Sequence, residues 1–195
     1  MLITKPLNLS INEHFLKITE DNCEKELLKE LKGKILLLEQ YKNYALTFYC
    51  DVLYYLDLNK TRYIVFGYDL EGYFVINKKD GYVFYLCNGD NKDKEFSLRF
   101  CNSNINHFIA FNNLFIYAVL KHDVKSKDIS PGHNEHNKID IANALETYYR
   151  ECEPASMDEN NFWEIRTYEL NDGFYPTNDA QIKFHEKYSL DKNKI

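Results

Sequence analysis

The stretch YIVFGYDLEGYFVINKKDGYVFYL, residues 63–86, is the feature that most constrains how this chain can fold. It consists of short apolar runs rich in aromatic and β-branched residues, which are typical of strands, separated by turn residues. Its first run ends at Gly67, and the Asp80-Gly81 pair is a strong hairpin signal that places a turn at residues 78–81. The stretch therefore predicts antiparallel strands.

The segment GYDLEG within this stretch invites a functional interpretation. Asp69 and Glu71 could form a carboxylate pair for acid–base catalysis. A phosphate-binding loop, in contrast, needs GxGxxG before a helix or GxxxxGK[ST], and neither pattern is complete here. We favour a solvated turn between two strands.

The sheet is expected to begin well before this stretch. Residues 21–33 have the apolar spacing of an amphipathic helix. Residues 34–41, 44–51 and 52–58 are then short β-rich runs broken by polar residues, and each indicates a strand. The section from about 34 to 101 is thus predicted to be mainly an antiparallel meander.

A helix is predicted after the meander, because apolar residues recur at helical spacing from Ile105 to Val119. Asn102 and Ser103 are its possible N-caps. Since the helix follows a sheet and is apolar over more than half its circumference, we expect it to lie buried on that sheet.

The C-terminal third is predicted to contain one loop and further helices. Residues 122–138 are polar and contain Pro-Gly, which indicates a mobile loop. Residues 139–190 indicate a helical part with two or three helices and a stop at Gly173. The whole order predicts a single α+β domain over residues 1–195, an antiparallel meander flanked by helices.

Composition narrows the class of protein. With 195 residues, 45% hydrophobic and 15% aromatic, the chain can build a core and is not of the disordered class. Its net charge of −6 and the lack of a basic patch argue against direct nucleic-acid binding. Apolar runs fall short of the roughly 20 residues of a membrane span, and the start lacks a signal-peptide pattern. We expect a cytoplasmic protein.

A metal site and a cysteine nucleophile are both possible, but in each case a non-functional interpretation of the residues is favoured. His133, Glu135 and His136 could hold a metal, but incidental histidines in a polar loop are favoured. Cysteines are odd in number and scattered, without a CxxC pair, which is typical of reduced thiols. A Cys–His nucleophile stays open because its partners meet only in space, although buried inert thiols at Cys50, Cys87 and Cys101 are favoured. We expect no catalytic constellation, no metal and no cofactor.

Charge is concentrated in one segment. Between Glu151 and Asp172 there are seven acidic residues and one basic residue, Arg166. Such a segment can be a solvated face or a helix N-terminus, for which Asp158 and Glu159 are suited. Because it also carries aromatic residues, it can equally serve a basic protein partner. Both interpretations stay open from charge alone.

Three motifs in order resemble the SUKH superfamily of bacterial immunity proteins, and its fourth subfamily most. Residues 63–86 resemble the family's strand, glycine turn and hairpin. FCNSNINHFIAF resembles its strand-to-helix junction, with Asn104 in place of the second Ser, and PASMDENNFWEIRTYELNDG resembles a late helical segment. The resemblance covers about residues 5–173, and the loop at 122–138 is an insertion.

The resemblance implies a non-enzymatic SUKH-like fold that binds a protein. Members are immunity partners encoded beside polymorphic toxins, many of them nucleases or nucleic-acid deaminases, which they neutralise by tight binding. The expected contact groups for a toxin domain lie at the sheet rim and in the late helices: Tyr68, Asp69, Glu71, Tyr73, Asp158, Glu159 and Trp163. Two alternatives are a regulatory scaffold for housekeeping proteins and, less favoured, a hydrolase.

Overall fold

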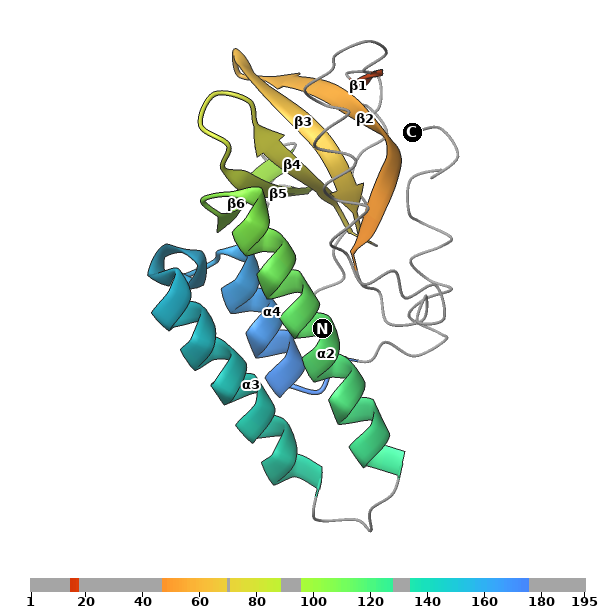
Figure 1. The fold of residues 1–195 in the computed structure, drawn as a ribbon, viewed down its shortest axis with the longest axis vertical. Coiled ribbons are helices and arrows are strands. Elements are labelled where there is room, and N and C mark those ends of the chain that lie inside the picture. The colour runs from red at the N-terminus through yellow and green to blue at the C-terminus, as the bar shows by residue number, and fades with distance from the viewer. Residues whose placement is uncertain (1–14, 18–46, 70, 89–95, 128–133, 176–195) are drawn as a thin grey trace.

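The computed structural model describes residues 15–17, 47–69, 71–88, 96–127 and 134–175. In these residues the chain forms one antiparallel sheet, with a group of helices on one side of it (Figure 1). The helix predicted at 21–33 and the strand predicted at 34–41 lie outside the described residues.

The sheet is a meander, because its spatial order β1-β2-β3-β4-β5-β6 follows the chain and every neighbouring pair is antiparallel. This confirms the predicted α+β class and the antiparallel meander. The strands are β1 (Phe15–Lys17), β2 (Phe48–Leu58), β3 (Thr61–Tyr68), β4 (Tyr73–Asn77), β5 (Val83–Asn88) and β6 (Phe96–Asn102).

One strand replaces two that the sequence indicates. The runs at 44–51 and 52–58 are not separated by a turn, since β2 continues through both. Its register against β3 shifts between Tyr49 and Tyr54, where β2 has more residues than its partner strand. A bulge of this kind bends a strand without ending it, so the polar break in the sequence marks an irregularity within one strand.

Both faces of the sheet are buried. In β4, Phe74 and Ile76 belong to the core shared with the helices, whereas Tyr73 and Val75 belong to a second cluster on the opposite face. Side chains in a strand alternate between faces, and both faces here need apolar residues. The near-continuous apolar runs of residues 63–86 follow from that double burial.

The hairpin between β4 and β5 turns where Asp80-Gly81 predicts it. Gly81 has a positive φ of 79°, which favours glycine, and its N–H donates to the Asn77 carbonyl at 2.8 Å. The Asp80 carboxylate accepts the N–H of Tyr82 at 3.0 Å. The predicted turn is confirmed.

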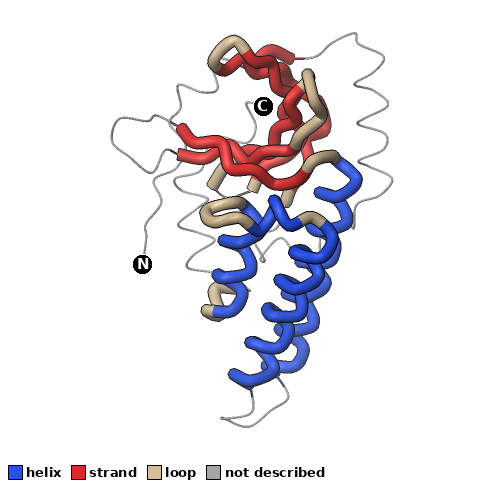
Figure 2. Tube along the Cα trace, turned by 90° about the vertical axis from the view of Figure 1, so that its left-hand side faces the viewer, coloured by secondary structure: helices blue, strands red, loops and turns tan. Residues whose placement is uncertain are grey.

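The helices lie on one side of the sheet and extend away from it (Figures 1 and 2). The predicted helix after the meander is confirmed, and its apolar residues Phe108, Ile109, Phe115, Ile116 and Val119 are buried in the core. The helical elements are α2 (Ile105–Lys127), α3 (Asn134–Cys152), the short 3-10 helix η3 (Pro154–Met157) and α4 (Phe162–Asn171).

The predicted loop at 122–138 is wrong at both ends. Residues 122–127 continue α2, and residues 134–138 already belong to α3. These turns of the helix backbone project beyond the sheet (Figures 1 and 2). The polar composition of the segment therefore did not mark the ends of the two helices.

Helix ends are set by local hydrogen bonds. Asn104, and neither Asn102 nor Ser103, caps α2, because its side-chain oxygen accepts the His107 N–H at 2.9 Å. Asn and Ser are equally good N-caps, so the departure at Asn104 preserves the capping chemistry. At the other end of the chain, Gly173 has φ of 74° and ends α4, which confirms the predicted stop.

Candidate partner-binding site

The turn between β3 and β4 is organised by Asp69. One carboxylate oxygen of Asp69 accepts the N–H groups of Glu71 and Gly72, both at 2.8 Å, and the Tyr85 hydroxyl at 2.7 Å. A Cβ on Gly72 would lie 2.4 Å from the carbonyl oxygen of Leu86, so the turn packs too closely on β5 for any side chain. Asp69, Glu71 and Gly72 thus serve the turn between the two strands.

The second Asp69 oxygen binds Arg166 of α4. The Arg166 guanidinium donates to Asp69 at 2.5 Å and to the Glu169 carboxylate at 2.9 Å, and it also donates to the Tyr175 hydroxyl. The rings of Phe162, Tyr85 and Tyr175 lie 5.0, 5.9 and 5.8 Å from its central carbon. We call Asp69, Tyr85, Arg166, Glu169 and Tyr175 the Asp69 cluster.

The surroundings fix the protonation states of Arg166 and Tyr85 in the Asp69 cluster. Burial acts against the charged form of Arg166, but Tyr175, Glu169 and Asp69 outweigh it and raise the pKa of Arg166. Burial is also the main reason why the pKa of Tyr85 is raised well above its ordinary value. The guanidinium therefore stays charged and the phenol stays neutral, as a donor to Asp69.

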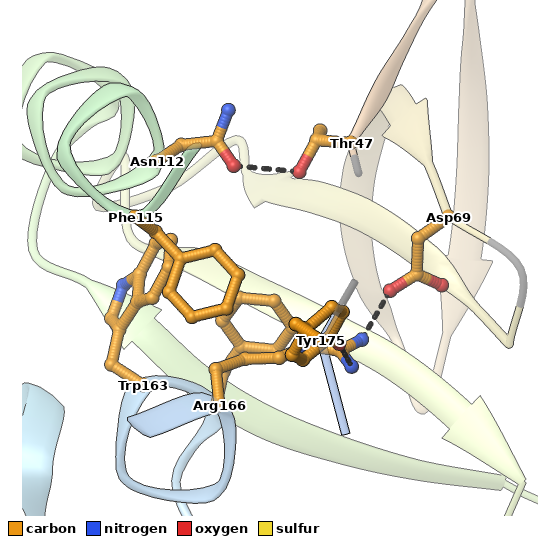
Figure 3. A pocket seen from close by; sticks show the side chains of 8 residues that line it. Thr47, Asp69, Asn112, Phe115, Trp163, Arg166 and Tyr175 are labelled. Atoms are coloured by element: carbon orange, nitrogen blue, oxygen red, sulfur yellow. Dashed lines mark hydrogen bonds and ion pairs between the residues drawn. The ribbon is translucent and has the colours of Figure 1, made fainter. Parts of the chain in front are cut away.

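A small cavity lies beside the cluster (Figure 3). Its volume is about 10 Å³, which is at the lower limit for one water molecule. Figure 3 shows Asp69 and Arg166 joined on one side of it and the Thr47 hydroxyl donating to the Asn112 side-chain oxygen, at 2.7 Å, on another. The cavity offers no room for a substrate. Its walls are Thr47, Asp69, Asn112, Phe115, Phe162, Trp163, Arg166 and Tyr175.

A second buried network joins the β6–α2 junction to the late helices. The Glu153 carboxylate accepts the Asn102 amide at 2.7 Å and the Ser103 N–H at 2.6 Å, and lies 3.1 Å from His107 Nδ1. Trp163 donates its indole N–H to Asn102 at 2.8 Å. We call these five residues the Glu153 network. The Glu153 network connects the start of η3 and the first turn of α4 to the end of β6.

Hydrogen bonding decides the ionisation of Glu153. Burial alone would raise the pKa of this carboxyl, but donors on Asn102, Ser103 and His107 together lower it below its ordinary value. Glu153 is thus an anion whose charge is satisfied within the fold.

Three of the expected contact residues are buried, which contradicts their predicted role as partner contacts. Asp69 is 6% exposed, Tyr73 is 3% exposed and Trp163 is 1% exposed. The first and last belong to the polar networks above, and Tyr73 packs in the cluster on the far face of the sheet. Side chains with so little surface hold the fold and do not offer a docking surface.

The other four expected contact residues remain accessible. Tyr68 and Glu71 are half-buried near the β3–β4 turn, whereas Asp158 and Glu159 are exposed. Asp158 and Glu159 lie in the turn between η3 and α4, which begins at Phe162 after the N-cap Asn161.

The acidic segment divides into two groups. Glu153 and Glu169 are bonded within the fold, to Asn102 and Arg166 respectively. The remaining five acidic residues face solvent fully or in part: Glu151, Asp158, Glu159, Glu164 and Asp172. The role of Arg166 was not predicted from the sequence, although a lone cation among seven acidic residues was a signal for an internal ion pair.

The structure gives no support to the possible cysteine nucleophile or metal site in the residues that it describes. Cys87 and Cys101 are buried, and burial raises the pKa of the Cys101 thiol well above its ordinary value, so it is not a thiolate. His133 and the side chains of Cys50, Glu135 and His136 lie outside the described part of the chain. Where the structure does describe side chains, no three His, Cys, Asp or Glu gather as metal ligands.

Comparison with known proteins identifies one family. Residues 51–169, more than half of the chain, match the family model described as SUKH-4 immunity protein. No curated protein and no solved structure matches the chain. Of the helices that the structure describes, none has the length and apolar character to cross a membrane. The resemblance to the fourth SUKH subfamily is confirmed.

Proposed function

Because the chain belongs to the SUKH-4 immunity protein family, which implies a toxin-immunity function, we propose that it neutralises a basic toxin domain that acts on nucleic acid. A nuclease or a nucleic-acid deaminase is the class of toxin that we favour. Neutralisation would consist of tight binding that covers the catalytic cleft or occupies the surface on which the nucleic acid would lie.

The observation that carries this proposal is the acidic surface of the late segment. Enzymes that bind nucleic acid need lysines and arginines for phosphate contacts. A protein of net charge −6, with five acidic residues of one segment facing solvent, complements such a surface. Complementary charge speeds association and selects partners.

Two surfaces supply the proposed contacts. One is the rim of the sheet at the β3–β4 turn, with Tyr68 and Glu71. The other is the turn before α4, with Asp158 and Glu159. Tyrosine at the first surface can act as a desolvated anchor, whereas the carboxylates of the second act through charge.

Growth rescue tests the proposal. The C-terminal domain of the protein encoded next to this chain would be expressed in a test bacterium, alone and with this chain. We expect arrest in the first case, and growth with a co-purifying complex in the second. A neighbour that arrests growth, while this chain neither rescues it nor binds it, would contradict the proposal and favour a regulatory scaffold.

A matched pair of variants tests the role of charge. Glu159→Gln and Asp57→Asn each remove one exposed carboxylate, the second at the β2–β3 hairpin, where Asp57 pairs with Arg62 at 2.8 Å. If recognition uses the turn before α4, Glu159→Gln slows association and Asp57→Asn does not. Equal effects would mean that only net charge matters.

A further inference from the structure

A cleft between α3 and α4 lies outside both buried networks. Its volume is about 90 Å³. Residues three and four apart share one helix face, and the cleft is formed where two such faces meet. Its walls are Ala142, Asn143 and Glu146 of α3, and Glu164, Thr167, Tyr168 and Asn171 of α4.

The cleft carries surplus negative charge. Glu146 accepts a hydrogen bond from Arg150 at 2.9 Å, and both side chains are about half exposed. Glu164 has no ion-pair partner among the residues that the structure describes. Two carboxylates on the walls thus face one cation, Arg150, which lies outside the lining.

Hydroxyl and ring groups on α4 complete the walls. The Thr167 hydroxyl donates within its own helix, to the carbonyls of Trp163 and Glu164 at 3.0 and 2.9 Å. Tyr168 is 63% exposed, more than any other large hydrophobic residue in the described part of the chain. The neighbouring Asp172 side chain raises the pKa of the Tyr168 phenol, so the ring stays neutral.

The size of the cleft limits its occupant. Pockets for nucleotides and drug-sized molecules are about 300–1,000 Å³, several times larger than this one. A volume of about 90 Å³ suits the end of one side chain. The occupant is therefore part of a larger partner that binds around the cleft.

Carboxylates beside an aromatic ring are the chemistry that binds a guanidinium. A planar guanidinium donates two parallel hydrogen bonds to a carboxylate and stacks on an aromatic face, which a lysine ammonium does less well. The protein already holds one arginine in this way, since Arg166 is bound by Asp69 and Glu169 beside the ring of Phe162.

We propose that the α3–α4 cleft receives an arginine side chain of the toxin domain, with Glu164 as its main carboxylate partner and Tyr168 as its stacking surface. This inference rests on the proposed function, because it names the chemistry of the contact through which that partner is bound. It places the centre of recognition at Glu164 and Tyr168, which lie within the acidic segment between Glu151 and Asp172, and adds the facing residues of α3.

The chemistry of the cleft can be tested without the toxin. The probe is N-acetyl-arginine methylamide, titrated into the ¹⁵N-labelled full chain and followed by amide chemical shifts. We expect shifts in residues 142–146 and 164–171 for the wild type. The matched probe is the citrulline derivative, which has the same shape without the charge. Equal shifts from citrulline or from the lysine derivative, or no shifts in these segments, would overturn the assignment to arginine.

The role of the cleft in recognition is tested with the neighbour-encoded toxin domain. We expect Glu164→Gln and Tyr168→Ala each to weaken binding by about tenfold or more, as truncation of an interface anchor does. Glu151→Gln, which removes an exposed carboxylate that does not line the cleft, should change it by less than about twofold. If the wild type binds while both cleft variants keep its affinity, the cleft inference fails alone. If the wild type does not bind, the proposed function fails.

Discussion

The Asp69 cluster and the α3–α4 cleft are built from the same kinds of group and do opposite things. Each combines carboxylates, tyrosine and residues of α4. In the cluster the charges are paired and buried, with Arg166 held between Asp69 and Glu169. In the cleft the carboxylates exceed the cations and face solvent. The same types of residue therefore have a structural role where their charges are paired and buried, and a recognition role where carboxylates are in excess and exposed.

The largest expected effect is the loss of Arg166. Arg166→Leu leaves the carboxylates of Asp69 and Glu169 without their cation, one of them in a site only 4% exposed. Breaking a buried ion pair by removing one partner costs about 3–5 kcal/mol. Urea unfolding should show this loss.

The control for that prediction is Glu146→Gln, which removes a surface pair and keeps the hydrogen bond of Arg150 to the Met157 carbonyl. Glu146 pairs with Arg150 at a similar distance, 2.9 Å, but both side chains are about half exposed. A surface pair contributes at most about 1 kcal/mol. Similar losses of unfolding free energy in the two variants would contradict the distinction between the buried ion pair of the Asp69 cluster and the exposed pair at the cleft.

Gly72 and Gly81 allow a test of how closely the Asp69 turn packs on β5. A Cβ on Gly72 would lie 2.4 Å from the Leu86 carbonyl oxygen and 2.7 Å from the Tyr85 ring, so Gly72→Ala must displace backbone. We expect a loss of about 3 kcal/mol, the upper end of the usual range for overpacking. Gly81→Ala meets open space and loses only about 1 kcal/mol, from its positive φ. The reverse order in unfolding free energies would contradict the packing.

The Glu153 network predicts a pH dependence. The folded-state pKa of Glu153 lies below its ordinary value of 4.5, so its contribution is present above pH 4.5 and is lost as the pH falls through the lower folded value. At pH 7, Glu153→Gln should cost about 1.5–3 kcal/mol, the range for hydrogen bonds to a charged group. The difference from wild type should shrink below pH 4.5. A difference that stays constant down to pH 3 would mean that the fold does not lower the pKa of Glu153.

The smallest effect is expected in the cleft. Tyr168 is largely exposed, and Tyr168→Ala should change the free energy of unfolding by no more than about 0.5 kcal/mol. Its thermal midpoint should match that of the wild type, even though binding of the toxin domain is weakened. A large loss of stability would place Tyr168 with the Asp69 cluster and not with the recognition surface.

The sequence predicted the elements that depend on local pattern. The meander, the Asp80-Gly81 turn, the buried helix after β6 and the stop at Gly173 all follow from residue spacing and turn chemistry. The merging of two predicted strands into β2 did not follow, because a bulge and a short turn leave similar polar marks in a sequence.

Long-range partners could not be predicted in this way. Asp69 and Arg166 are far apart in the chain, and spacing says nothing about which carboxylate a buried cation will meet. The result was an Asp69 interpreted as solvated and as a contact residue when it is buried. The cleft was missed for a related reason, since Glu164 and Tyr168 look like any solvated face until α3 lies beside them.

The most direct test of the account is amide hydrogen exchange of the full chain with and without the neighbour-encoded toxin domain. Binding is expected to slow exchange in residues 142–146 and 164–171, the two segments that contain the lining of the α3–α4 cleft. New protection confined to residues 68–73, with none in α3 or α4, would contradict the cleft as the centre of recognition and leave the rim of the sheet in that role.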